Sequence, residues 1–405
     1  MAKAFATRPA VGRPGLARIA ALGGVVVLVG GMVAACGGGA SPSPVASAAP
    51  SAAPTAAACD PGAALKTLET TVLSKGPNGE TPTSPTEVTL SAEELQKIKD
   101  MKATAAIVMH YGGNDWSQAQ VAGLKQQFGE MGIEVIAVTD ANFKPEKQVS
   151  DIETVLAKKP SIIVSIPTDP VATEAAYKKA GAQGVKLVFM DNVPKNMTAG
   201  TDYIASVSAD NFGNGVAAAH LTAKALNCKG TVGLIYHEAD FFVTRQRYDA
   251  VKQTLQQNYP DIQIVEEQGI TGPDFTGDAE KAASAMLTKH PDLSAIWAVW
   301  DVPAEGVVAA ARTAGRKDLV ITTIDLGLNV AILIAKGELV YGLGAQRPFD
   351  QGVNEAKLAG YGLLGKQAPA YVALNALPVT KDNVLDAWQT VYHAAPPDDL
   401  ANAAK

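Results

Sequence analysis

Short apolar stretches alternate with longer amphipathic ones from Ala103 onward. The first series of apolar, β-rich stretches comprises Ala105–Met109, Ile133–Val138, Ser161–Ile166, Lys186–Met190 and Ile204–Val207. The second series comprises Thr231–Tyr236, Ile262–Gln268, Ala295–Val299, Val320–Ile324 and Val340–Leu343. Helical patterns lie between them, such as Trp116–Gly129, Lys147–Lys158 and Pro170–Ala182. Strands that alternate with helices predict parallel sheets built from right-handed βαβ units. The sequence therefore predicts an α/β protein with two similar, doubly wound parallel-sheet lobes.

The segment before this alternation, residues 60–102, has a different pattern. Ser91-Ala-Glu-Glu94 is a capping box, and Leu95, Ile98 and Met101 follow it at helical spacing. We predict a helical preamble here, packed on the main body.

The N-terminus carries the pattern of an export signal. Three arginines precede the apolar run Ile19–Ala35, which ends in small residues directly before Cys36. This run of 17 residues is at the lower limit for a membrane-spanning helix. The cysteine favours a bacterial lipoprotein signal, in which residues 1–35 are removed and Cys36 is lipidated. The alternative is an uncleaved anchor helix, and both interpretations place the rest of the chain outside the cytoplasm.

The composition of residues 36–59 predicts a disordered tether. Between Gly37 and Ala58 there are only Gly, Ser, Pro, Ala, Thr and one Val, which cannot form a core. Such a segment spans on the order of 25 Å as a random coil. The two cysteines that remain, Cys59 and Cys228, either pair in the oxidising compartment or are unrelated thiols, and sequence alone leaves both open.

Composition and charge indicate a folded protein that does not bind nucleic acids. The 405 residues are 47% apolar and 18% charged, as in a folded protein of two or three domains. Removing residues 1–35, which hold four basic residues and no acidic one, changes the net charge from -6 to -10. An acidic chain lacks the basic surface that nucleic acids require, so we expect no nucleic-acid partner.

Polar and aromatic residues gather where the predicted strands end, which is where parallel sheets bind ligands. These positions hold His110 to Trp116, Asp191-Asn192, His237 to Phe242, Trp300-Asp301, Asp325 and Gln346-Arg347. There is no nucleophile motif such as G-x-S-x-G and no metal-ligand spacing. We therefore expect a binding protein rather than an enzyme, with no cofactor and no metal.

The order and spacing of these residues resemble the ribose-binding branch of the type I periplasmic binding proteins, over about residues 103–391. The resemblance implies a ligand site between the lobes that comprises Asn114, Trp116, Asp191, Asn192, Arg245, Phe275, Trp300, Asp325 and Gln346. Ribose binders carry Arg where Asn192 stands, Asn where Trp300 stands, and Pro-Phe at Asp115-Trp116. These departures favour a related sugar or a polyol over ribose.

The chemistry of a polyol fits these residue types. Asp191 and Asp325 can each accept from two hydroxyls, and an arginine can donate in a fork. Of Arg245 and Arg247, we expect only Arg245 to point inward. Trp116, Phe275 and Trp300 can lie flat against C–H faces, whereas Trp297 is assigned to the core.

Several residues at the strand ends have a second interpretation. Asp191 and Asp325 could instead cap helices, and Phe241 and Phe242 could either line the cleft or pack between the lobes. For His110 and His237 we expect a structural hydrogen bond.

The resemblance also implies a domain organisation and a role. A first lobe of residues 103–209 plus 347–375 and a second of 210–346 plus 376–395 would be joined by a three-crossing hinge. The crossings are expected near Ala209-Asp210, Gln346-Arg347 and Asn375-Ala376, with residues 396–405 as a tail. The implied role is that of a monomeric, extracytoplasmic substrate-binding lipoprotein, which delivers a small sugar or polyol to an ABC permease and ATPase complex.

Two other functions are compatible with parts of the sequence. The same fold can present its ligand to a chemoreceptor or a sensor kinase. Residues 213–218 with Glu238 form a loose dinucleotide fingerprint, as in an exported NAD-dependent oxidoreductase, although the glycines could simply ease helix packing.

Overall fold

Both predicted sheets are present in the computed structural model, which describes residues 59–405. The first sheet has the strand order β11-β5-β4-β3-β1-β2, and the second has the order β12-β10-β9-β8-β6-β7. All neighbouring strands are parallel except β10 and β12. The prediction of an α/β fold with two doubly wound lobes is confirmed. The predicted signal peptide, Cys36 and nearly all of the tether lie outside the described residues.

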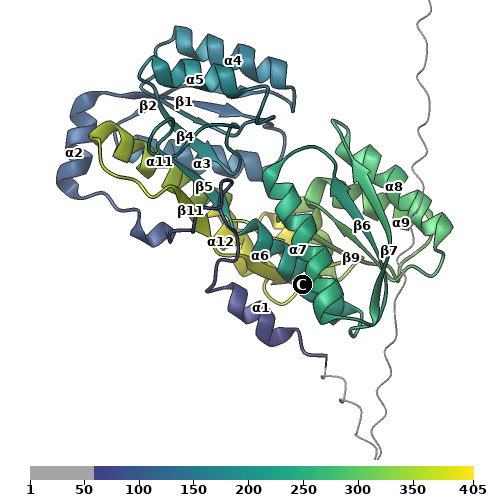
Figure 1. Ribbon diagram of the computed structural model, residues 1–405. Helices are drawn as coiled ribbons and strands as arrows, with labels where there is room; N and C mark the ends of the chain where they lie inside the picture. Colours follow the sequence, from purple (N-terminus) through teal and green to yellow (C-terminus); the bar gives the residue numbers. More distant parts are fainter. Residues whose placement is uncertain (1–58) are drawn as a thin grey trace, which may run out of the picture. The chain divides into compact units, whose positions relative to one another are not determined.

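The first lobe consists of the first sheet and the helices on its two faces. Its strands are β1 (Thr104–Met109), β2 (Glu134–Asp140), β3 (Ile162–Ser165), β4 (Lys186–Met190), β5 (Ala205–Ala209) and β11 (Tyr371–Leu374). Its helices are α3 (Asp115–Glu130), α4 (Pro145–Ala157), α5 (Glu174–Ala182) and α11 (Pro348–Leu364). Helices α4 and α5 cover one face of the sheet, and α3 and α11 cover the other (Figure 1).

The second lobe repeats this plan. Its strands are β6 (Gly230–His237), β7 (Ile262–Ile270), β8 (Ala295–Ala298), β9 (Val320–Ile324), β10 (Val340–Ala345) and β12 (Leu377–Thr380). Its helices are α6 (Asn211–Ala225), α7 (Phe242–Asn258), α8 (Phe275–Lys289), α9 (Asp301–Thr313) and α10 (Leu328–Lys336). Helices α6 and α7 lie on one side of the sheet, and α8 and α9 on the other (Figure 1).

Strand β1 shows why the sequences of the strands are nearly continuous apolar runs. Successive side chains of a strand point to opposite faces. Ala105, Ile107 and Met109 join the core that includes residues of α3 and α11, whereas Ala106 and Val108 join the core that includes residues of α4 and α5. Because helices bury both faces, the strands are mostly apolar, as in other parallel sheets, and buried polar residues such as Ser165 and Thr323 are hydrogen-bonded.

The chain passes between the sheets three times: between β5 and β6, between β10 and β11, and between β11 and β12. The ten predicted strands are confirmed, but β11 and β12 were not predicted. Their sequence is one apolar run without a clear period, and Pro378 argues against a strand. The structure accommodates Pro378 because β12 lies at the edge of its sheet.

The preamble contains α1 (Gly62–Leu68), the 3-10 turn Pro85–Glu87 and α2 (Ala92–Met101). The predicted capping box is present, since Ser91 Oγ accepts from the Glu94 N–H at 3.2 Å and Glu94 Oε2 accepts from the Ser91 N–H at 2.8 Å. Ile98 is fully buried in the core of the first lobe, as predicted, but Met101 is exposed.

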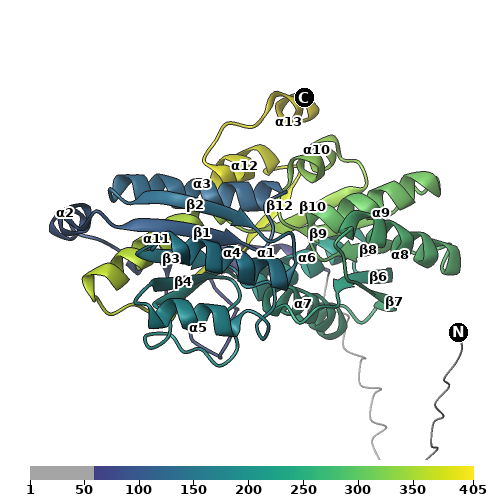
Figure 2. The ribbon, with the colours of Figure 1, turned by 90° about the horizontal axis from the view of Figure 1, so that it is seen from above.

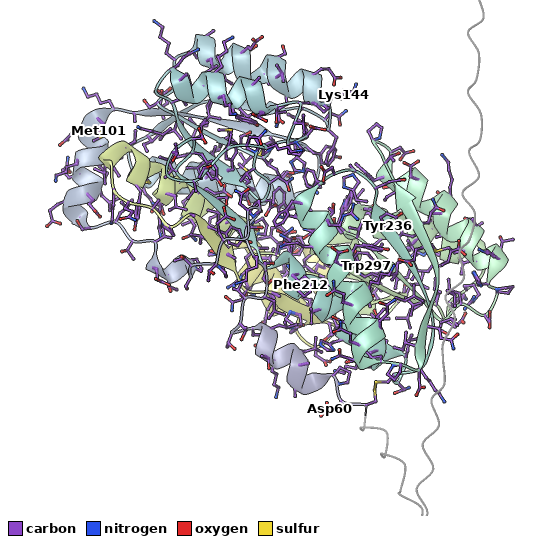
Figure 3. The ribbon with its side chains drawn as sticks, viewed as in Figure 1. Asp60, Met101, Lys144, Phe212, Tyr236 and Trp297 are labelled. Carbon is purple, nitrogen blue, oxygen red and sulfur yellow. A yellow bond between two sulfur atoms is a disulfide. The ribbon has the colours of Figure 1, made fainter. Side chains whose placement is uncertain are left out.

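This preamble runs from the second lobe to the first and is fixed along the way. A disulfide joins Cys59 to Cys228, just beyond α6, with the Cα atoms 5.8 Å apart. It lies beside Asp60 in Figure 3. Further along, the Asp210 carboxylate accepts hydrogen bonds from the N–H groups of Leu73 and Ser74, each at 2.8 Å. Thr83 then pairs with Val372 of β11. The preamble therefore forms a strap across the first crossing between the lobes.

The C-terminal segment is more structured than the predicted tail. After α12 (Val384–Tyr392), residues of the tail form α13 (Asp398–Ala403). Leu400 is fully buried, and α13 packs beside α10 (Figure 2). Within residues 59–405, no helix is both long and apolar enough to cross a membrane.

The disulfide of the strap should contribute to the free energy of unfolding. The disulfide joins residues 169 positions apart. A cross-link that closes a loop of this length lowers the entropy of the unfolded chain and can raise the free energy of unfolding by up to about 5 kcal/mol. We expect the double variant Cys59→Ser/Cys228→Ser to lose about 2–5 kcal/mol of unfolding free energy in urea titrations. The native chain kept in reductant should match the variant. Equal stability of the oxidised native chain and the variant would contradict the prediction.

Candidate functional site

A cavity of about 230 Å³ lies between the two lobes, at the carboxyl ends of their strands. The first lobe contributes His110, Tyr111, Asn114, Trp116 and Phe143. The second lobe contributes His237, Thr244, Arg247, Pro273, Asp274, Phe275, Thr276, Trp300, Val302, Asp325 and Gln346. We call this space the inner cavity. It is smaller than the roughly 300–1,000 Å³ of most ligand pockets, so it suits a small ligand.

Six of the nine residues predicted to bind ligand line the inner cavity. They are Asn114, Trp116, Phe275, Trp300, Asp325 and Gln346. Each stands at a strand end or the start of a helix. Trp300, Asp325 and Gln346 follow β8, β9 and β10, and Asn114 is the N-cap residue of α3. The topology thus brings residues far apart in the sequence to one place.

The polar centre of the cavity is the carboxylate of Asp325. Its Oδ2 accepts from Arg247 Nη1 at 3.0 Å, and its Oδ1 accepts from Gln346 Nε2 at 2.8 Å. Arg247 also donates to Asn211 Oδ1 and to the Val299 carbonyl. Arg247 is only 3% exposed, so its charge is desolvated, and the pair with Asp325 compensates it.

The arginine in this site is a correction to the sequence analysis. Arg245, which we expected to point inward, is exposed on α7, and Arg247 is buried against the cavity. A helix turns by about 100° per residue, so side chains two positions apart point to nearly opposite sides. The sequence Thr-Arg-Gln-Arg offers both residues, and only the packing of α7 selects between them.

Asp191 and Asn192 do not line the inner cavity. Asp191, directly after β4, is buried and accepts from Ser208 Oγ at 2.6 Å and from Gln351 Nε2 at 3.4 Å. Burial raises the pKa of Asp191 to about 6, against the opposing effect of the Ser208 hydrogen bond. Asn192 is also buried and lines a separate groove. Their predicted contact with ligand therefore remains a prediction.

Asp191 and Asp325 occupy equivalent positions after the fourth strand of each series, and both have a left-handed backbone. Their φ angles are +53° and +70°, which is uncommon for residues other than glycine. Neither is an N-cap residue of a helix, so the alternative role as caps does not apply. Such strain is often found at functional sites.

Aromatic rings form the walls of the cavity. Phe275 packs edge-on against Trp300 at 4.8 Å and against Phe143 of the first lobe at 5.1 Å between ring centroids. Trp116 lies edge-on to His110 at 5.9 Å. Trp297, by contrast, is fully buried in the core of the second lobe, as predicted.

Two histidines line the cavity from corresponding strands, His110 after β1 and His237 at the end of β6. Thr244 Oγ1 donates to the Phe241 carbonyl at 3.0 Å, so His237 Nδ1 must donate to Thr244 Oγ1 at 3.2 Å. The Nε2 atom of His237 is then an acceptor. The expected structural hydrogen bond is thus present for His237, but among the described residues His110 Nδ1 has no partner.

Both imidazoles are neutral near pH 7. Burial lowers the pKa of His237 to about 4, with a smaller effect of the Arg247 charge. Burial, assisted by His237, lowers the pKa of His110 to about 3. The charges of the cavity wall therefore come from Arg247 and from the carboxylates of Asp274 and Asp325.

A hydrogen bond also joins the lobes beside the cavity. Asp115 Oδ2, in the first turn of α3, accepts from the Leu328 N–H at 2.8 Å. Leu328 begins α10, whose N-terminal N–H groups favour a carboxylate. This contact and the Phe143–Phe275 pair hold the two sides of the cleft together.

The sequence analysis did not select Phe143, Thr244 or Arg247. Phe143 follows β2 after a short turn, so its place at a strand end was the available signal. Thr244 and Arg247 lie one turn apart on α7, and their selection depends on how that helix packs.

Of the two glycines in residues 213–218, Gly215 serves helix packing, whereas Gly213 lies against the side chain of Asp210. A Cβ on Gly215 would lie 2.5 Å from the Arg247 carbonyl oxygen, so the glycine allows α6 and α7 to approach. Glu238 is exposed. Within residues 59–405 there is also no group of three His, Cys, Asp or Glu side chains that could hold a metal ion.

A family model described as "Periplasmic binding protein domain" matches residues 105–367. The chain belongs to the periplasmic binding protein family. It is therefore an extracytoplasmic solute-binding protein and not an enzyme, as the sequence predicted. The preamble precedes the matched residues.

Relatives of this periplasmic binding protein include a ribose import binding protein and a sugar-transporter subunit. It is 28% identical over 229 residues to the ribose import binding protein of Bacillus subtilis, covering 56% of this chain and 70% of that protein. A solved sugar-transporter subunit from Rhodobacter sphaeroides shares 27% identity, with a TM-score of 0.62 over 69% of this chain and 99% of that one. A binding protein from Agrobacterium vitis, solved with α-D-tagatopyranose, has a TM-score of 0.67 at 22% identity and covers 72% and 99% of the two chains.

The two arginines provide a matched pair of variants. Replacing Arg247 by Ala leaves the buried Asp325 carboxylate without its charged partner, which should cost about 3–5 kcal/mol of unfolding free energy. Arg245→Ala, on the same helix but exposed, should change it by no more than about 0.5 kcal/mol. Urea titrations measure both. Similar losses in the two variants would contradict the assignment of the buried arginine.

Because His237 is neutral in the folded chain, folding stability should depend on pH. Between pH 6.5 and 4 the unfolded chain binds a proton at His237 and the folded chain does not, so folding stability falls as the pH falls. From pH 7 to pH 5 this contribution amounts to about 2 kcal/mol. We therefore expect the native chain to lose about that much more unfolding free energy than His237→Gln over this range.

Buried carboxyls such as Asp191 have raised pKa values and change stability in the opposite direction, but they are present in both proteins and cancel in this difference. A difference between the two proteins that does not change with pH would show that His237 is not held neutral.

Proposed function

We propose that the chain is the extracytoplasmic substrate-binding lipoprotein of an ABC importer and that its ligand is a small sugar or polyol. The observation that carries this proposal is the inner cavity, in which polar groups from both lobes converge between aromatic walls. The ligand is held by lobe closure and is then delivered to the permease and ATPase complex.

The polar groups of the cavity match the hydrogen bonds of hydroxyls. Gln346 Oε1 is a buried acceptor and Trp116 Nε1 a buried donor, and neither has a partner among the described residues. An unpaired buried polar group costs roughly 1–3 kcal/mol, so a ligand that satisfies both gains that energy. A hydroxyl can both donate and accept, which makes a polyol suited to a mixed set of this kind.

The aromatic walls match the other surfaces of such a ligand. Trp116, Phe275 and Trp300 present ring surface to a space of about 230 Å³. The C–H faces of a sugar or polyol can pack against these rings. We assign ligand contact to Asn114, Trp116, Arg247, Phe275, Trp300, Asp325 and Gln346.

The names of the relatives support the same class of ligand. One is a ribose import binding protein, one is a sugar-transporter subunit, and one was solved with α-D-tagatopyranose. Trp300 and Asn192 stand where ribose binders carry Asn and Arg, so we propose a related sugar or a polyol in place of ribose.

The N-terminus supports attachment to the membrane. We propose that residues 1–35 are removed and that Cys36 carries the lipid, with the segment up to Cys59 as a tether. The disulfide between Cys59 and Cys228 is consistent with an oxidising compartment outside the cytoplasm.

A thermal-shift and calorimetric screen of residues 59–405 tests the ligand class. The panel should include pentoses, hexoses, polyols, amino acids and nucleosides. A sugar or polyol present at 100 times its dissociation constant should stabilise the native chain by about 2.7 kcal/mol. Stabilisation by an amino acid or a nucleoside alone would contradict the proposal.

The matched variants are Gln346→Leu and Arg245→Ala. Gln346→Leu removes an acceptor without changing charge and should weaken binding by about 1–3 kcal/mol, which is fivefold or more. Arg245→Ala, at an exposed position that does not line the cavity, should bind as the native chain does. Unchanged affinity in Gln346→Leu would place the ligand elsewhere.

A further inference from the structure

Phe241 belongs to the second lobe but is buried in the core of the first. It is the residue before α7, and its side chain joins the cluster that includes Met109, Ile166 and Met190. These three residues stand at the ends of β1, β3 and β4. The ring of Phe241 therefore covers the part of the first sheet where parallel strands present ligand-binding residues.

Neighbouring rings hold Phe241 in this position. It stacks on His110 of the first lobe, with centroids 5.7 Å apart and an interplanar angle of 26°. It also packs against His237 of the second lobe at 5.8 Å. Only 6% of Phe241 is exposed, so the residue fills the space between the lobes at this point.

Residues close to Phe241 in the chain line two separate hollows. The inner cavity includes Thr244 and Arg247, which follow Phe241 on α7. A second hollow of about 670 Å³, which we call the outer groove, includes Asp240 and Phe242, the residues directly before and after Phe241. The outer groove is also lined by Asn78, Glu80, Asn192 and Lys195. The ring of Phe241 contacts His110 and His237, which line the inner cavity, while its two neighbours in the chain line the outer groove, so the ring lies where a partition between the two spaces would stand.

The partition explains the position of Asn192. This residue is 4% exposed, and neither its amide oxygen nor its amide nitrogen has a partner among the described residues. Buried amide groups are normally hydrogen-bonded, so a ligand group that paired with Asn192 would gain binding energy. Asn192 faces the outer groove, where a ligand confined to the inner cavity does not reach it.

We propose that Phe241 separates the inner cavity from the outer groove, that it thereby restricts the closed site to ligands of monosaccharide size, and that its burial in the first lobe holds the lobes closed. The restriction of ligand size rests on the proposed function. Removal of the ring would join the two spaces and give larger ligands access to Asn192.

Calorimetric titration of residues 59–405 with monosaccharides, polyols of four to six carbons, and disaccharides tests the restriction. We expect the native chain to bind only the smaller ligands. Phe241→Ala should lower the ratio of the disaccharide to the monosaccharide dissociation constant at least tenfold. Phe242→Ala removes the adjacent ring, which lines the outer groove and is only partly buried against the first-lobe core, and should keep the native ratio, whereas Phe241→Leu should be intermediate. A native ratio in Phe241→Ala, with cooperative unfolding retained, would overturn the proposal.

A measurement without ligand separates this inference from the proposed function. Spin labels at Lys179→Cys and Lys317→Cys, both on exposed positions, report the distance between the lobes. The ligand-free Phe241→Ala protein should show a longer distance than the native chain and Phe242→Ala. If no sugar or polyol binds the native chain, the proposed function fails. The distance measurement is independent of that result, and a distance between the labels that Phe241→Ala leaves unchanged would overturn the role of Phe241 in holding the lobes closed.

Discussion

The buried guanidinium of Arg247 is the group around which the cleft is organised. It contacts Asn211 at the start of α6, the Val299 carbonyl after β8, and Asp325 after β9. Asn211 in turn donates to Ser208 Oγ, and Ser208 donates to Asp191. One chain of hydrogen bonds thus runs from a carboxylate of the first lobe, past the first crossing, to the carboxylate at the centre of the cavity. A buried charge requires such compensation, so the strand ends of both lobes are fixed by the same network.

The two lobes place similar groups at equivalent positions because both sheets share the same order of strands. In each series the first strand lies between the second and the third, and this is the switch point at which such sheets bind ligands. His110 and His237 stand at the ends of the two first strands, and Asp191 and Asp325 follow the two fourth strands. The lobes differ in what covers these ends. On the first lobe, Phe241 packs in the cluster that includes Met190, the residue before Asp191, and the inner cavity draws its charged groups from the second lobe.

The sequence predicted the fold more completely than the site, for physical reasons. Strands buried on both faces have a strong apolar signal, which located ten strands and, through topology, five of the six cavity residues, whereas Phe275 came from the family resemblance. The strands β11 and β12 lie in a single apolar run that lacks a period. The choice of Arg247 over Arg245 depends on the rotation of α7, and the absence of Asp191 and Asn192 from the lining of the inner cavity depends on how the two lobes pack. Sequence left the pairing of Cys59 with Cys228 open, because it could not bring the two cysteines within bonding distance.

A crystal structure of residues 59–405 grown with the sugar or polyol that stabilises the chain most would test the central claim directly. The account predicts one ligand in the inner cavity, with hydroxyls within hydrogen-bond distance of Asp325, Arg247 and Gln346 Oε1 and with a C–H face against Trp300 or Phe275. A ligand bound outside this cavity, or one that makes no contact with the Arg247–Asp325 pair, would contradict it.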